Sequence, residues 1–192
     1  MTGSIPNEYF DRLYADNPDP WRFATSPYER DKYDDTIAAL EGRKFAAGFE
    51  AGCSIGILTN RLAPLSDRLL AVDVAPAALA AAKQNCADHT NITFERRRIP
   101  DQWPAGPFDL IILSEVLYYL EESDIRLTAA HTQESLRPGG MVVLVHYTEP
   151  TDYPVSGNTA AEIFIDACAG RLHADLSLIR QQYRLDRLRE GK

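Results

Sequence analysis

Patterns typical of strands and of helices alternate along most of this sequence, and this alternation limits the possible folds more than any other feature. Buried strands are predicted from short apolar runs over residues 46–51, 68–74, 92–96, 108–114 and 141–147. Helical patterns between them begin near Gly56, Pro76 and Asp124. Because strand–helix–strand units arrange their strands in parallel, the order predicts an α/β fold with helices on both faces of a mostly parallel sheet.

The two ends of the chain depart from this alternation. At the amino end, a proline-containing arm over residues 1–25 is followed by a helix over residues 26–40, where Ser26 is placed to cap the helix. At the carboxyl end, a helix near 159–168 precedes two short strand-like runs over 176–179 and 183–188. No repeat or linker interrupts the pattern.

Composition narrows the classes of protein and partner. With 192 residues, of which 45% are apolar and 25% charged, the chain fits one globular domain over residues 1–192. The formal net charge of −8 argues against nucleic acid as a partner, because phosphate binding needs a basic surface. Three cysteines without a CxxC pair favour a reducing, cytoplasmic compartment. We expect neither a secretory signal nor a membrane span.

A glycine-containing loop, residues 50–56 (Glu-Ala-Gly-Cys-Ser-Ile-Gly), lies where the first strand should turn into a helix. Glycine there allows a ligand to lie against the backbone, and the next helix presents free N–H groups. Asp73 ends the following strand, where a carboxylate can accept hydrogen bonds from both hydroxyls of a ribose. Since the two strand ends lie at one edge of a parallel sheet, the features together predict a nucleoside site.

Other interpretations of this loop remain open. The glycines can simply permit a tight turn, with Asp73 an ordinary loop residue. A nicotinamide dinucleotide in an oxidoreductase is the competing ligand, but its fingerprint has a glycine where Ser54 stands, which lets the pyrophosphate approach the backbone. An adenosyl amino acid has no pyrophosphate and therefore fits this loop better.

Together the motifs resemble those of class I S-adenosylmethionine-dependent methyltransferases over nearly the whole chain. The similarity rests on four segments in the family's order, residues 50–56, 70–74, 108–117 and 136–140. The resemblance implies a Rossmann-like fold with a seven-stranded sheet, whose last two strands form an antiparallel hairpin. It also implies S-adenosyl-L-methionine as the cofactor.

The resemblance also implies which residues touch that cofactor. The glycine loop would lie beside the methionine part, the end of the second strand would bind the ribose and adenine, the third strand's exit would flank the adenine edge, and the fourth strand's end would lie near methionine and adenosine. In that order these residues are Gly52, Cys53, Ser54 and Gly56; Asp73 and Val74; Arg98 and Ile99; and Ser114 and Leu117.

A narrower resemblance, to the NodS-like nodulation N-methyltransferases, begins at the amino end. Residues 9–11, 19–21 and 26–33 carry it, and it continues through the glycine loop into residues 183–186. That family methylates an amino sugar of a chitooligosaccharide, so the resemblance implies an amine acceptor of that kind. O-methylation of another small metabolite and a non-catalytic cofactor-binding protein remain alternatives.

Aromatic and charged residues near the amino end each have two possible roles. Trp21 either belongs to a lid over the cofactor, formed by residues 1–40, or anchors the arm through hydrophobic packing. Arg30 and Lys32 are candidates to pair with the cofactor carboxylate, although Lys32 fits a solvated helix face better. The acceptor would be bound in part by Tyr28 and Glu29, and Glu29 is first of all expected to cap its helix.

Residues after the fourth and fifth strands are expected on the acceptor side. His146 is the candidate catalytic base, and the alternative is a satisfied histidine at a strand end. Of Tyr118 and Tyr119, one is expected to pack inward and the other to line the acceptor pocket. Cys86 and His89 are close at a helix end, but without a second pair of ligands no metal site is expected.

Overall fold

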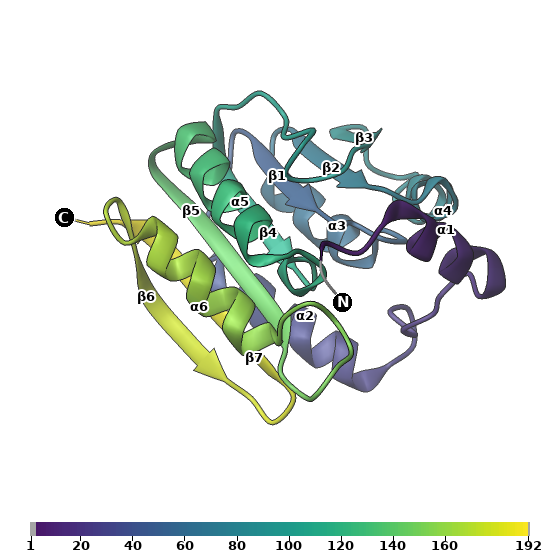
Figure 1. The fold of residues 1–192 in the computed structure, drawn as a ribbon. Coiled ribbons are helices and arrows are strands. Elements are labelled where there is room, and N and C mark those ends of the chain that lie inside the picture. The colour runs from purple at the N-terminus through teal and green to yellow at the C-terminus, as the bar shows by residue number, and fades with distance from the viewer. Residues whose placement is uncertain (1–2, 192) are drawn as a thin grey trace. The chain divides into compact units, whose positions relative to one another are not determined.

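The computed structural model describes residues 3–191, which divide into two compact units. The N-terminal unit consists of residues 6–98, and the C-terminal unit consists of residues 3–5 together with 99–191. Figure 1 shows the helices and strands of each unit. None of the helices within residues 3–191 has the length and apolar character that a membrane crossing needs. The expectation of one domain remains a prediction.

Three parallel strands form the sheet of the N-terminal unit, in the order β3-β2-β1. In chain order its elements are α1 (Asn7–Asp16), α2 (Pro27–Ala39), β1 (Gly48–Ala51), α3 (Ile57–Leu62), η1 (Ala63–Leu65), β2 (Leu69–Asp73), α4 (Pro76–Asn85) and β3 (Ile92–Arg96). Since Ala51 pairs with Val72, the carboxyl ends of β1 and β2 lie at the same edge, where the glycine loop begins.

Helix α1 is the main departure from the prediction, which had only an arm over residues 1–25. Pro6 stands directly before the helix, where its missing N–H costs no hydrogen bond, and Pro18 lies beyond its end. Phe10 and Tyr14 are four residues apart and lie on one side of the helix, with Tyr14 buried. The prolines therefore bracket a helix, whereas the prediction took them as evidence of an irregular arm.

The predicted start of the second helix is confirmed. Helix α2 begins at Pro27, and the hydroxyl of Ser26 accepts a hydrogen bond from the backbone N–H of Glu29. Strands β1 to β3 and helices α3 and α4 also match the predicted positions to within about two residues at each end.

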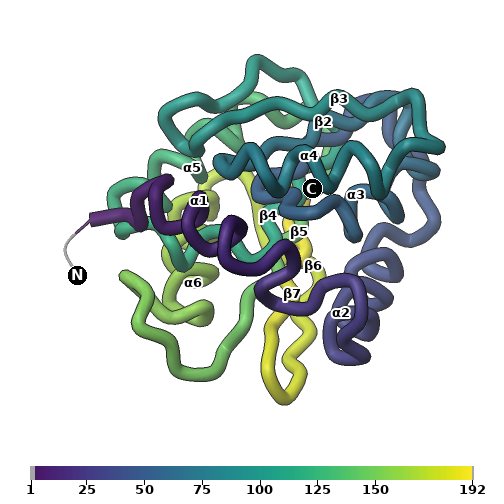
Figure 2. Tube along the Cα trace, turned by 90° about the vertical axis from the view of Figure 1, so that its right-hand side faces the viewer, coloured from purple at the N-terminus to yellow at the C-terminus, as the bar shows by residue number. Residues whose placement is uncertain are grey.

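The C-terminal unit contains four strands in the order β4-β5-β7-β6. Its elements are β4 (Phe108–Ser114), η2 (Leu117–Tyr119), α5 (Glu122–Ser135), β5 (Leu136–Tyr147), α6 (Gly157–Cys168), β6 (Leu172–Ile179) and β7 (Tyr183–Glu190). Strands β4 and β5 are parallel, whereas β7 is antiparallel to both β5 and β6. The turn of the predicted C-terminal hairpin, residues 180–182, is the yellow loop at the bottom of Figure 2.

Strand β5 starts five residues earlier than the sequence predicts. Leu136 pairs with Phe108, and the register then shifts so that Leu110 faces Met141. The shift accommodates the intervening Pro-Gly-Gly segment as an irregularity within the strand, where the prediction had a turn before it. Beyond the shift, residues 110–113 and 141–145 are completely buried, as expected for strands that read as continuous apolar runs.

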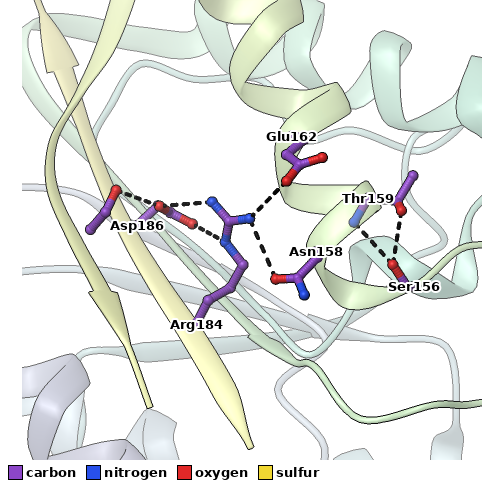
Figure 3. Close-up of polar contacts among 7 residues, drawn as sticks. Ser156, Asn158, Thr159, Glu162, Arg184 and Asp186 are labelled. Atoms are coloured by element: carbon purple, nitrogen blue, oxygen red, sulfur yellow. Dashed lines mark hydrogen bonds and ion pairs between the residues drawn. The ribbon is translucent and has the colours of Figure 1, made fainter. Parts of the chain in front are cut away.

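A polar network joins β7 to β6 and α6 (Figure 3). The completely buried carboxylate of Asp186 accepts two hydrogen bonds from the Arg184 guanidinium, at 2.8 and 3.2 Å, and one from the Ser177 hydroxyl at 2.7 Å. The same guanidinium lies 3.5 Å from side-chain oxygens of Asn158 and Glu162 on α6. This buried charge therefore has its countercharge within the fold.

Candidate functional site

The glycine loop turns from β1 into α3 through three residues with left-handed backbone. Their φ angles are 73° at Gly52, 51° at Ser54 and 81° at Gly56, a region that side chains other than glycine rarely adopt. The N–H groups of Gly52 and Cys53 both donate to the carbonyl of Val72, at 2.8 and 2.9 Å. The loop is thus fixed to the end of β2 by its own backbone.

Packing alone already requires glycine at position 56. A Cβ there would lie 3.0 Å from both the Cα and Cβ of Ala82 and 3.1 Å from the Sγ of Cys86. The side-chain amide of Asn85 also donates to the carbonyl of Ile55, at 2.8 Å. Part of the glycine pattern is therefore explained by the approach of α4, as the structural interpretation of the sequence allowed.

Ser54 stands where dinucleotide-binding loops have a glycine, and its backbone keeps the conformation that glycine favours. That conformation costs roughly 1–2 kcal/mol for a residue with a Cβ. The Ser54 hydroxyl forms a hydrogen bond with the phenol of Tyr14, and its N–H donates to Asp73 Oδ2 at 2.9 Å. Burial raises the pKa of Tyr14, and the nearby Asp73 raises it further, so the phenol stays protonated.

Asp73 is a buried carboxylate whose two hydrogen bonds come from the backbone. Oδ2 accepts from Ser54 and Oδ1 accepts from the N–H of Ala75, each at 2.9 Å. Desolvation raises the pKa of this group, and the bonds from Ala75 and Ser54 act against that rise. Because a carboxylate can accept about four hydrogen bonds, this one can also receive the hydroxyls of a ribose.

A second buried carboxylate, Glu50, lies at the end of β1. The hydroxyl of Thr59 donates to its Oε2 at 2.6 Å. Burial raises the pKa of Glu50 to about 7, with the Asp73 charge adding to the rise. At neutral pH this side chain is consequently close to half protonated, unlike an ordinary glutamate.

Trp21 packs into a hydrophobic cluster that includes loop residue Ile55. Its ring lies 5.9 Å from that of Tyr14 and 5.4 Å from that of Phe23. Asp19 stabilises the turn by accepting hydrogen bonds from the backbone N–H groups of residues 23 and 24. The anchoring role of Trp21 is therefore seen directly, and a lid role remains a prediction.

The interpretation of Lys32 as part of a solvated face of α2 is wrong. Lys32 is 2% exposed, and its ammonium pairs with the buried carboxylate of Glu29 at 2.9 and 3.1 Å. The Tyr28 ring centroid lies 5.1 Å from the same ammonium, within the range of a cation–π interaction. Glu29 therefore does more than cap its helix. Arg30, by contrast, is exposed.

The predicted adenine-edge residues are distributed over both units. Arg98 of the N-terminal unit is half-buried and donates to the side chain of Asn7 at 2.8 Å. Val74 is half-buried, and its carbonyl accepts a bond from Arg96. Ile99 is buried in the C-terminal unit.

In the C-terminal unit, a carboxylate and a group of aromatic rings lie after β4 and β5. Glu115, directly after β4, has a left-handed backbone with φ of 57°. Its Oε2 accepts a hydrogen bond from the phenol of Tyr118 at 2.6 Å and another from the N–H of Tyr147 at 3.0 Å. Ser114 before it is half-buried, and Leu117 is completely buried.

The rings of Tyr118, Tyr119, Tyr153 and His146 form what we call the aromatic cluster. Tyr118 stacks on Tyr153 with centroids 5.3 Å apart, and Tyr119 contacts both edge-on at 4.7 and 4.6 Å. Burial raises the pKa of Tyr118, and the neighbouring Glu115 raises it further. The two predicted tyrosines do not divide into one buried and one open residue, since both are less than 9% exposed.

His146 is completely buried. Its ring meets Tyr118 edge-on at 5.8 Å, and it stands opposite Arg184 in the β5–β7 ladder. A Cβ on Gly157 would be 3.1 Å from His146 Cβ, so the start of α6 lies directly against this part of β5. A proton moving between this ring and a substrate would have to pass through a neighbouring group. The role of His146 as base remains a prediction.

Cys86 and His89 make other contacts. The Cys86 thiol donates to the Gly56 carbonyl at 3.3 Å, and His89 Nε2 lies 2.7 Å from Asn60 Oδ1. Within residues 3–191, no group of three or more His, Cys, Asp or Glu side chains is arranged to hold a metal ion.

Tyr14 and Glu115 occupy these sites without being among the predicted site residues. For Tyr14 the available signal was its helical spacing from Phe10, which the flanking prolines obscured. For Glu115 it was a charged residue directly after the most apolar strand, the edge at which parallel sheets bind ligands.

Comparison with known proteins gives consistent matches. A family model described as Nodulation protein S (NodS) matches residues 8–144. The nodulation protein S of Sinorhizobium fredii is 33% identical over 127 residues, which is 65% of this chain and 59% of that protein. The corresponding protein of Rhizobium tropici is 32% identical over 65% of this chain and 53% of its own length. The matched region thus spans little more than half of these relatives.

Solved structures extend the match. The crystal structure of N-methyltransferase NodS from Bradyrhizobium japonicum in complex with S-adenosyl-L-homocysteine has a TM-score of 0.84 and 28% identity, covering 97% of this chain and 98% of that one. A putative methyltransferase from Pseudomonas syringae has a TM-score of 0.73 and 32% identity, covering 83% and 97%. The predicted class I methyltransferase fold is confirmed, including its seven strands and antiparallel β5-β7-β6 end.

Proposed function

Because this chain belongs to the NodS family of nodulation proteins, we propose that it is an S-adenosylmethionine-dependent N-methyltransferase. The observation that supports this most is the glycine loop with Asp73 beside it. Backbone N–H groups of the loop and the Asp73 carboxylate meet at the carboxyl ends of β1 and β2. Asp73 can accept ribose hydroxyls there, and the left-handed residues keep side chains away from the backbone.

The cofactor would be held by residues of both strand groups. From the N-terminal unit we propose Trp21, Arg30, Gly52, Cys53, Ser54, Gly56, Asp73, Val74 and Arg98; from the C-terminal unit, Ile99, Ser114 and Leu117. Asp73 would select a ribose, and Trp21 would cover an apolar part of the cofactor. Such contacts position the methyl donor and exclude water around it.

The acceptor is proposed to be the amine of an amino sugar, in particular a chitooligosaccharide with a free amine. Tyr28, Glu29, Tyr118 and Tyr119 would contribute to its binding, and His146 would receive the amine proton through a neighbouring group. The net charge of −8 is compatible with a cationic acceptor. Three buried free thiols, Cys53, Cys86 and Cys168, support action in the cytoplasm.

When bound, the cofactor supplies an electrophilic methyl group on a sulfonium. The chain's own contribution is to align the acceptor nitrogen with that methyl and to accept its proton, since only the free amine has a lone pair for attack. The rate should consequently rise as pH increases toward and past neutrality.

The test of this function is methyl transfer from labelled cofactor to two matched chitooligosaccharides, one with a free terminal amine and one fully acetylated. We expect label only on the free amine. Equal labelling of both would exclude the amine as the target. Labelling of neither, in a protein that binds S-adenosylhomocysteine, would remove the sugar acceptor from the proposal.

A further inference from the structure

We propose that Glu115 binds the amine of the acceptor and that Tyr118 holds the Glu115 carboxylate in position. The inference rests on the proposed N-methyltransferase function and deepens it by naming the group that selects an amine. Glu115 follows β4, and the N–H of Glu115 donates to the carbonyl of Val145 at 2.7 Å, so it lies where the ends of β4 and β5 meet.

The first observation behind the proposal is the backbone of Glu115. A glutamate with φ of 57° is strained, because its Cβ approaches the carbonyl oxygen that follows. Such strain costs about 1–3 kcal/mol and persists only where the surroundings enforce it, typically at ligand sites. Glycine or asparagine would adopt this turn at lower cost, so the turn alone does not explain a glutamate.

The second observation is the support given to the carboxylate. The phenol of Tyr118 and the N–H of Tyr147 both donate to the same oxygen, Oε2. Tyr118 is in turn held by the stacked ring of Tyr153 and the edge of His146. The carboxylate therefore has a fixed direction, which is what a group that orients a ligand requires.

The third observation is the chemistry of the surroundings. Glu115 lies beside the aromatic cluster, and Tyr153 of that cluster is half-buried, in the segment between β5 and α6. Aromatic faces attract a nearby ammonium, and a carboxylate forms strong hydrogen bonds with one. Both groups therefore favour a cationic acceptor, and one hydrogen bond from the nitrogen to Glu115 would leave its lone pair free to turn toward the methyl donor.

The test uses the full chain saturated with S-adenosylhomocysteine, with the mono-amine chitooligosaccharide as the titrant in calorimetry. Glu115→Gln keeps the size of the side chain and removes the charge, and Tyr118→Phe removes only the supporting hydroxyl. The matched control is Glu122→Gln, an exposed glutamate of the same unit in the first turn of α5. Thermal melting and the Kd for S-adenosylhomocysteine establish that each variant is folded.

We expect Glu115→Gln to raise the acceptor Kd and KM about 10- to 100-fold, the scale of losing a charge-assisted hydrogen bond. Tyr118→Phe should raise them several-fold, and Glu122→Gln should leave them unchanged. If Glu115→Gln does not fold, Glu115→Asp, which keeps the charge but shortens the reach, should raise KM more than kcat falls. Unchanged acceptor affinity in folded Glu115→Gln or Glu115→Asp would overturn this proposal alone. A wild type that methylates no amine would overturn the proposed function as well.

Discussion

Two buried carboxylates at opposite ends of the chain have opposite surroundings. Asp186, on β7, is bonded to the guanidinium of Arg184 and to the Ser177 hydroxyl. Asp73, at the end of β2, accepts its hydrogen bonds from the backbone N–H groups of Ser54 and Ala75. The first has a full countercharge, and desolvation raises the pKa of the second.

This difference separates a structural charge from a binding one. A buried charge that has a guanidinium partner adds to the integrity of the fold, and removing one partner leaves the other uncompensated. A buried carboxylate bonded to backbone N–H groups keeps a cost of desolvation that a ligand's hydroxyls can reduce. We therefore expect substitutions at Asp186 to lower stability, and substitutions at Asp73 to lower ligand affinity.

The largest effect is expected for Asp186→Ala. Loss of the carboxylate leaves the Arg184 guanidinium, whose side chain is 12% exposed, without its bidentate partner. Breaking a buried pair of this kind typically costs about 3–5 kcal/mol of unfolding free energy, measurable by urea denaturation. Asp175→Ala is the control, because Asp175 pairs with Arg187 and Arg189 but is 23% exposed. A loss at Asp186 no larger than at Asp175 would break the contrast.

A third buried carboxylate sharpens the comparison through its pH dependence. The pKa of Glu50 rises from 4.5 to about 7 on folding, so the native state holds this proton more tightly than the unfolded state. Stability from this group is then greatest below pH 4.5 and falls as pH rises toward 7. Across that window Glu50→Gln should gain roughly 3 kcal/mol relative to wild type. Parallel stability curves from pH 4.5 to 8 would contradict the burial argument.

The complementary prediction is that Asp73→Ala weakens binding more than folding. Affinity for S-adenosylhomocysteine should fall by about 1.5–3 kcal/mol, the scale of losing charge-assisted hydrogen bonds. The unfolding free energy should change less than in Asp186→Ala, because loss of two backbone hydrogen bonds is offset by removal of a desolvated charge. Unchanged affinity in the folded variant would exclude Asp73 from the site.

The smallest effect is expected at Ser54. Ser54→Gly removes a Cβ from a left-handed residue, a gain of about 1 kcal/mol, and loses the hydrogen bond with Tyr14, which costs a similar amount. The melting temperature should therefore stay within a few degrees. Combining it with Tyr14→Phe, which removes the same bond, should reveal the gain alone. A large loss in that double variant would show that the loop does not need glycine-like backbone.

Sequence reasoning predicted the elements whose signals are local. The apolar runs of β4 and β5 and the cap at Ser26 identify themselves, because burial and capping depend on neighbouring residues. Contacts between distant segments could not be predicted. Neither the burial of Lys32 against Glu29 nor the bond from Tyr14 to Ser54 leaves a local pattern, because each depends on how helices pack. The strain at Glu115 likewise follows from the tertiary arrangement.

The central claim is that the glycine loop with Asp73 binds an adenosyl amino acid. The most direct measurement is calorimetry of the wild-type chain with S-adenosylhomocysteine and with NAD under identical conditions. The account predicts saturable, micromolar binding of S-adenosylhomocysteine, a matching rise in melting temperature, and no saturable response to NAD. Saturable binding of NAD, with no response to S-adenosylhomocysteine, would contradict it.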